Sequence, residues 1–116
     1  MITGAHCIIY STRPKADRAF FRDVLKFPHV DVGSGWLIFG LPAAELAVHP
    51  AGNNNVHETY LMCDDVAALM LELSEQDISC SDIETMSWGS LTRITLPGGG
   101  SIGVYQPRHE TPAATG

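Results

Sequence analysis

The order of apolar and polar residues along the chain predicts two helices and eight short strands. In the first helix, Phe20, Val24 and Phe27 recur at spacings of three and four residues, the period of a helix with one buried face. Pro14 suits the first turn of that helix, where the missing N–H of proline removes no helical hydrogen bond. The expected strands cover residues 5–10, 29–32, 36–39, 45–49, 56–63, 81–86, 91–96 and 102–106.

The second helix is expected directly after the strand at 56–63. Asp64 or Asp65 can cap its N-terminus, because a carboxylate accepts hydrogen bonds from the unpaired backbone N–H groups of a first helical turn. Its apolar face is expected to carry Val66, Leu69, Met70 and Leu73.

The order of one strand, one helix and three strands therefore occurs twice. The loop at 51–55, Ala-Gly-Asn-Asn-Asn, separates the two occurrences. We expect an α+β fold with a single domain over 1–110, built from two β-α-β-β-β modules at about 1–52 and 53–108, and a flexible tail over 109–116. Sequence identity between the halves is slight, so it is the order of elements that repeats.

Charge excludes one class of function. The chain carries 7 Lys and Arg against 13 Asp and Glu, a formal net charge of −6, whereas nucleic-acid binding needs clustered basic residues. The basic residues between 13 and 26 fall in the first predicted helix, where we expect a solvated face, and a polyanion-binding patch is the alternative. No apolar stretch approaches the roughly 18–20 residues of a membrane span. The N-terminus shows no secretion signal, so we expect a cytoplasmic protein without a membrane partner.

Several segments resemble the vicinal oxygen chelate superfamily, which includes glyoxalase I, extradiol dioxygenases and bleomycin-resistance proteins. The resemblance covers nearly the whole chain. Its most characteristic pieces are the helix sequence at 18–27 and the Leu-Pro-Gly-Gly-Gly hairpin at 96–100, and the others are His6, the Cys-Asp-Asp-Val junction at 63–66 and the Trp-Gly turn at 88–89. The resemblance implies that each module curls a mixed sheet into half of an open barrel. It also implies a homodimer and a divalent metal in the enclosed cavity.

The same resemblance implies positions for metal ligands on the first and last strands of each module. His6 matches the first-strand position of the first module. In the second module Glu58 takes this position by the repeat register, and His57 is the alternative if the register differs by one residue. Glu45 or Leu46 occupies the last-strand position of the first module, where Glu45 would act as a ligand or as a catalytic base.

The last-strand position of the second module holds Gly103, which has no side chain to bind a metal. The implied ion is Fe, Mn, Ni or Zn, and a chain that binds no metal is the alternative. A substrate-binding role is expected for the aromatic residues of the strands and for a single late arginine, which could hold a carboxylate or enolate oxygen: Tyr10, Trp36, Tyr60, Tyr105 and Arg93. Core packing for the rings and a surface ion pair for the arginine are the alternatives.

Two functions follow from the resemblance. The first is a metal-dependent enzyme, a lyase, isomerase or dioxygenase that acts on a small oxygenated substrate, with the metal as a Lewis acid. The second is a metal-free dimer that binds and sequesters an aromatic compound, as bleomycin-resistance proteins do, and the glycine at 103 favours it. A purely structural or regulatory dimer is a third possibility, because a fold alone does not decide function.

Overall fold

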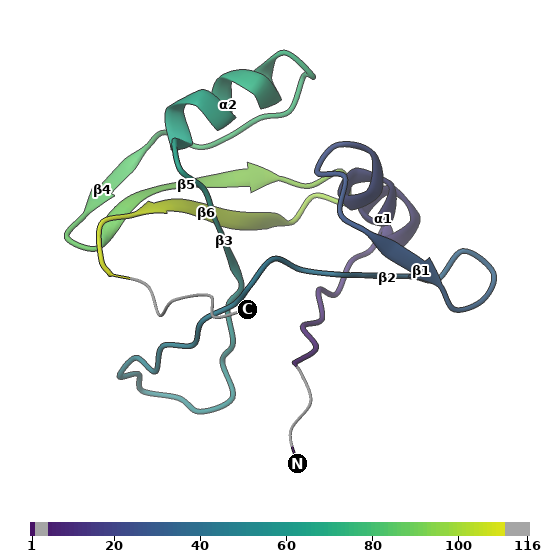
Figure 1. Ribbon diagram of the computed structural model, residues 1–116, viewed down its shortest axis with the longest axis horizontal. Coiled ribbons are helices and arrows are strands. Elements are labelled where there is room, and N and C mark those ends of the chain that lie inside the picture. Colours follow the sequence, from purple (N-terminus) through teal and green to yellow (C-terminus); the bar gives the residue numbers. More distant parts are fainter. Residues whose placement is uncertain (2–4, 111–116) are drawn as a thin grey trace.

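The computed structural model of the chain describes residue 1 and residues 5–110. The elements are two helices and six strands, arranged in two separate sheets (Figure 1). In chain order they are α1 (Pro14–Asp23), β1 (His29–Asp31), β2 (Leu37–Phe39), β3 (Tyr60–Met62), α2 (Val66–Ser74), β4 (Glu84–Met86), β5 (Gly89–Thr95) and β6 (Ser101–Pro107). The α+β architecture predicted from the sequence is confirmed. Of the predicted tail, residues 111–116 lie outside the described part of the chain.

The second half of the chain forms a four-stranded sheet in the order β3-β6-β5-β4. β5 pairs antiparallel with both β4 and β6, and β3 pairs parallel with β6. A parallel pair needs a crossover connection, and α2 lies in the connection that follows β3. The side chain of Asp65 caps this helix by accepting a hydrogen bond from the backbone N–H of Ala68 at 3.0 Å. α2 covers one face of β5 and β6 (Figure 1).

The first half of the chain forms only the antiparallel hairpin β1-β2. The strands predicted over 5–10 and 45–49 are not formed, and neither segment pairs with another strand in the described part of the chain. The apolar side chains of both segments lie in solvent, with Tyr10 and Leu46 each 90% exposed. Strand preference depends on packing against neighbouring strands, and here no neighbour covers either segment.

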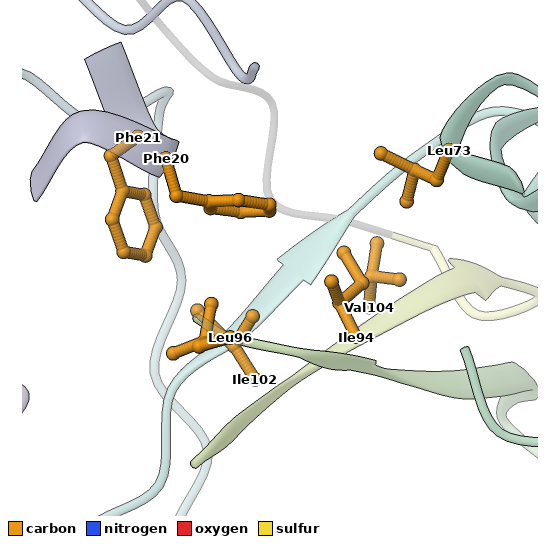
Figure 2. Packing of buried hydrophobic residues seen from close by; sticks show 7 residues of the cluster. All are labelled: Phe20, Phe21, Leu73, Ile94, Leu96, Ile102 and Val104. Atoms are coloured by element: carbon orange, nitrogen blue, oxygen red, sulfur yellow. The ribbon is translucent and has the colours of Figure 1, made fainter. Parts of the chain in front are cut away.

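The core lies between the two helices and the four-stranded sheet. Figure 2 shows Leu73 of α2 directed toward Ile94 and Val104 of the sheet, with Phe20 and Phe21 entering from α1. Ile94 is 0% exposed. The helix of the first half therefore packs into the same core as the strands of the second half. No helix of the described chain is long and apolar enough to cross a membrane.

A buried carboxylate joins α1 to the β5–β6 turn. Asp17 is 6% exposed and accepts a hydrogen bond of 2.7 Å from the backbone N–H of Gly98. Just before the helix, Thr12 and Arg13 donate to the carbonyl oxygens of Gly98 and Pro97 at 3.3 and 3.0 Å. The start of α1 and this turn are thus fastened to each other by three hydrogen bonds that span more than 80 residues of sequence.

The close approach at Gly98 predicts a large effect of one added methyl group. A Cβ at this position would lie 2.7 Å from both Asp17 Oδ2 and Ser11 Oγ, so Gly98→Ala should lower the free energy of unfolding by about 1–3 kcal/mol, the usual cost of overpacking. Gly100→Ala, two residues away, is the matched control, because nothing lies within 4 Å of its Cβ. Urea denaturation of both variants measures the difference, and equal stability of the two would contradict the packing of α1 on this turn.

Candidate functional site

The face of the four-stranded sheet opposite α2 carries a row of three residues that face each other across the strands. Arg93 of β5 pairs with Gly103 of β6, and Gly103 pairs with Tyr60 of β3. Side chains alternate between the two faces of a strand, so these residues point away from the core side chains of Ile94 and Val104. The next row on the same face places Tyr105 between Leu91 and Met62.

The Tyr60 ring packs directly on Gly103. A Cβ added at Gly103 would overlap ring atoms Cδ1 and Cε1 of Tyr60. The Tyr60 ring therefore lies over the β6 backbone and fills the space that a side chain at position 103 would take. This is the physical reason for glycine at the place where the superfamily resemblance implies a metal ligand.

Three aromatic rings meet beside this row, and we call Tyr60, Trp88 and Tyr105 the aromatic cluster. All three pairs stand edge to face, with ring centroids 6.5 Å apart for Tyr60–Trp88, 6.1 Å for Tyr60–Tyr105 and 5.0 Å for Trp88–Tyr105. Such perpendicular pairs each contribute about 0.5–1.5 kcal/mol beyond the area they bury. Each ring is only partly buried, so the cluster keeps apolar surface in contact with solvent.

A polar chain borders the cluster at the Tyr60 end. Arg93 Nη2 donates to the Tyr60 hydroxyl at 3.2 Å, and that hydroxyl donates to Glu58 Oε2 at 2.8 Å. The Arg93 guanidinium also lies 5.6 Å from the centroid of the Tyr60 ring. The hydrogen bond to Glu58 raises the pKa of the Tyr60 phenol, burial adds to the rise, and Arg93 opposes it. Tyr60 is therefore a neutral phenol at physiological pH.

A second polar group borders the cluster at the Tyr105 end. The Tyr105 hydroxyl donates to Glu45 Oε1 at 3.3 Å and lies 3.1 Å from His109 Nε2. His109 Nε2 is 3.7 Å from the same Glu45 oxygen. Burial, and then the Glu45 carboxylate, raises the pKa of Tyr105. Glu45 is the one residue between Gly40 and Glu58 that is not exposed, and its hydrogen bond with Tyr105 attaches this long connection to the sheet.

The structure brings together four of the predicted site residues, Tyr60, Tyr105, Arg93 and Glu45, and sets Glu58 beside them. It places the other two aromatic residues elsewhere. Tyr10 borders a separate cleft of about 290 Å³ between the start of α1 and the β5–β6 turn. Trp36 is 61% exposed next to α1, where the Arg18 guanidinium lies 4.8 Å from its ring centroid.

The predicted metal ligands do not gather into a site. His6 and His57 are both exposed, and Glu58 accepts a hydrogen bond from the Tyr60 hydroxyl. Within residues 5–110 there is no cluster of three or more His, Cys, Asp or Glu side chains that suits a metal ion. With Gly103 covered by a ring, the donors present do not fit the metal that the superfamily resemblance implies.

Two residues of this site were not predicted. The sequence indicates Trp88 only as part of a turn before the strand. His109 was assigned to the flexible tail. Arg108 donates its backbone N–H to the Trp88 carbonyl at 2.9 Å, which holds the neighbouring His109 beside the cluster. No pattern in the sequence around His109 indicates this contact.

The contact between Tyr60 and Gly103 can be tested by a double-mutant cycle. Gly103→Ala should lower the free energy of unfolding by about 1–3 kcal/mol, because the new methyl group displaces the ring. The same substitution in a Tyr60→Ala background should cost much less, since the ring is absent. Denaturant unfolding of the four proteins provides the comparison. An equal cost in both backgrounds would assign the effect to β6 itself and contradict the contact.

Comparisons with known proteins give likeness in structure alone. A scan of protein families and a search of curated proteins find no match. Among solved structures, the antibiotic binding protein TnmS3 from Streptomyces sp. CB03234 matches 92% of this chain and 99% of its own, with 21% identity and a TM-score of 0.63. Lactoylglutathione lyase from Agrobacterium tumefaciens matches 90% and 92%, with 18% identity and a TM-score of 0.66.

A third structure is a member of the glyoxalase/bleomycin resistance protein/dioxygenase superfamily from Sphaerobacter thermophilus. It covers 90% of this chain and 98% of its own, at 21% identity and a TM-score of 0.59. Sequence identities at this level establish shared architecture and carry no function from one protein to another. The resemblance predicted from the sequence is thereby confirmed for the architecture, and the chain has the glyoxalase/bleomycin resistance/dioxygenase fold.

Proposed function

We propose that this protein binds a small planar aromatic compound on the aromatic cluster, without a metal ion. The observation that carries the proposal is the placement of the Tyr60 ring over Gly103. The ring takes the volume of the side chain that would face a metal and joins Trp88 and Tyr105 in a partly exposed apolar surface. Apolar rings with a few polar groups at their borders are the ordinary composition of a small-molecule site.

The polar borders support the same function. Arg93 and Glu58 lie at one end of the cluster, and Glu45 and His109 lie at the other. These groups give a flat ligand hydrogen-bond partners at its edges while the rings contact its faces. The likeness to TnmS3, an antibiotic binding protein, agrees with a binding role, although it concerns the architecture alone.

A metal-dependent enzyme is the second candidate, and the structural likeness to a lactoylglutathione lyase is the observation in its favour. It requires His6 to approach Glu58 or Glu45, because imidazole and carboxylate groups together make a site for Fe, Mn, Ni or Zn. Glu58 would then have to release the Tyr60 hydroxyl. The ligand roles of His6, Glu58 and His57 and the catalytic role of Glu45 remain predictions of this second candidate.

Fluorescence of a single tryptophan tests the binding function. The chain has 2 Trp residues, so Trp36→Phe leaves Trp88 as the reporter within the cluster. 2-Naphthol should quench Trp88 saturably, and Tyr60→Ala in the same background should weaken binding by about 1 kcal/mol, roughly fivefold in Kd. Trp88→Phe, which leaves only the distant Trp36, is the control and should show no saturable quenching.

The same titration separates the two candidate functions when it is repeated with EDTA, alongside elemental analysis of protein purified without chelator. Binding that is indifferent to EDTA, in protein free of stoichiometric metal, supports the binding protein. Stoichiometric metal whose removal abolishes binding would favour the enzyme and contradict the proposal. Metal content of His6→Ala and Glu58→Ala would then show whether these residues are the ligands.

We also propose that the protein acts as a homodimer. Large apolar side chains with more than half of their surface exposed are concentrated in the first half of the chain: Ile8, Tyr10, Val30, Val32, Trp36, Leu46, Val48 and Val56. Exposed apolar surface on this scale is typical of a protein interface. The two segments that match strands in sequence, 5–10 and 45–49, lie within it and have no strand partner among the described residues, so a second copy supplies the missing neighbour.

Light scattering across a dilution series tests the dimer. The native chain should have about twice the mass of one chain at micromolar concentration. Leu46→Lys combined with Val48→Lys should raise the dimer dissociation constant by tenfold or more, because both side chains are 90% exposed in the single chain and become buried in the dimer. Leu71→Lys, 63% exposed on α2, is the matched control and should leave the mass unchanged. A monomer at every concentration would contradict the proposal.

A further inference from the structure

We propose that the ligand of the aromatic cluster is an aromatic acid, with its anionic oxygens on Arg93. This inference rests on the proposed binding function and adds to it the charge of the ligand. It starts from the pairing of charges around the cluster. Both acidic groups at its borders are already engaged, Glu58 by the Tyr60 hydroxyl and Glu45 by Tyr105 and His109. Arg93 has no carboxylate partner in the described part of the chain.

Arg93 is fixed in place although it has no ion pair. Its backbone N–H donates to Ser81 Oγ at 2.9 Å, and its carbonyl accepts from the Ser81 N–H at 2.9 Å, so Ser81 holds both backbone polar groups of Arg93. Its side chain is held at the Tyr60 hydroxyl by one hydrogen bond of 3.2 Å. A guanidinium has five N–H donors, so this one bond leaves most of them available on an exposed surface.

The arrangement suits a carboxylate attached to a flat ring. The planar guanidinium can donate two parallel hydrogen bonds to a carboxylate, a geometry that lysine cannot reproduce. The ring of the same ligand then lies on the apolar surface of Tyr60 and Trp88, which are 6.5 Å apart between centroids. The ring and the acid group are thus recognised by adjacent parts of one surface.

The surrounding charges determine the orientation of the ligand. The chain is acidic overall, with a formal net charge of −6, so its long-range field does not attract anions and the preference must arise at Arg93 itself. Glu58, one hydrogen bond beyond Tyr60, partly offsets the positive charge of Arg93. Glu45 repels an anion from the Tyr105 end, so the acid group lies at the Arg93 end of the cluster.

A pair of ligands that differ only in charge tests the inference. In the Trp36→Phe background, quenching of Trp88 is measured with 2-naphthoate and with its neutral counterpart 2-naphthamide. Naphthoate should bind at least tenfold more tightly than naphthamide, as expected for a charge-assisted hydrogen bond. Arg93→Met should remove this preference, so that the ratio of the two dissociation constants falls to about one. Circular dichroism confirms that each variant is folded.

Removing the negative charge of Glu58 should have the opposite effect on naphthoate affinity. Glu58→Gln keeps an oxygen that accepts from the Tyr60 hydroxyl but removes the negative charge, so it should increase the preference for naphthoate over naphthamide severalfold. Equal affinity of the native site for the two ligands, or full naphthoate affinity in Arg93→Met, would overturn the inference alone. Failure of both ligands to bind saturably would overturn the proposed function as well.

Discussion

Three residues of parallel pairing hold β3 against β6, and the register of that pairing sets Tyr60 directly opposite Gly103. A shift of one residue would turn the Tyr60 ring to the core face of the sheet. Because position 103 has no side chain, the ring can descend onto the β6 backbone, where it meets Trp88 and Tyr105 and receives a hydrogen bond from Arg93. The composition of the site is therefore a direct result of one strand register and one missing Cβ.

The stability of this sheet depends on the other half of the chain. Phe20 and Phe21 of α1 belong to the same buried cluster as Ile94 and Ile102, and Asp17 caps the turn that joins β5 to β6. The second module thus uses the first module's helix to complete its core. The hairpin β1-β2 is covered less completely, and its outer face stays in solvent, with Val30 60% exposed. The core of the second module is completed within the chain, whereas the first module keeps apolar side chains in solvent.

Local signals in the sequence were sufficient for some elements and not for others. The Asp65 cap, the proline at the start of α1 and the glycine turn between β5 and β6 act over a few residues, and the structure has all three where the sequence indicates them. The prediction of strands at 5–10 and 45–49 is wrong, because neither segment forms a strand in the described chain. Alternating apolar residues indicate strand propensity, whereas strand formation also requires a neighbouring strand that is distant in sequence.

The site divides in the same way. Tyr60, Arg93 and Tyr105 could be predicted because they lie on strands whose alternation is readable. The contact with Glu45 follows from the placement of a segment without secondary structure. The contact with His109 follows from the backbone hydrogen bond between Arg108 and Trp88. No hydrophobic periodicity in the sequence predicts either contact. Trp36 was grouped with these residues by type, but it belongs to the hairpin beside α1.

The connection between β2 and β3 can accept insertions at little cost in stability. Glu45 attaches it to the sheet, whereas the residues from Pro50 to His57 are all exposed and make no hydrogen bond to another described residue. Figure 1 shows this connection extending away from α2. The entropy of closing a loop grows only logarithmically with its length, so doubling this stretch costs about 0.6 kcal/mol. Insertions here can therefore change the surface beside the aromatic cluster while the core and the strand register stay unchanged.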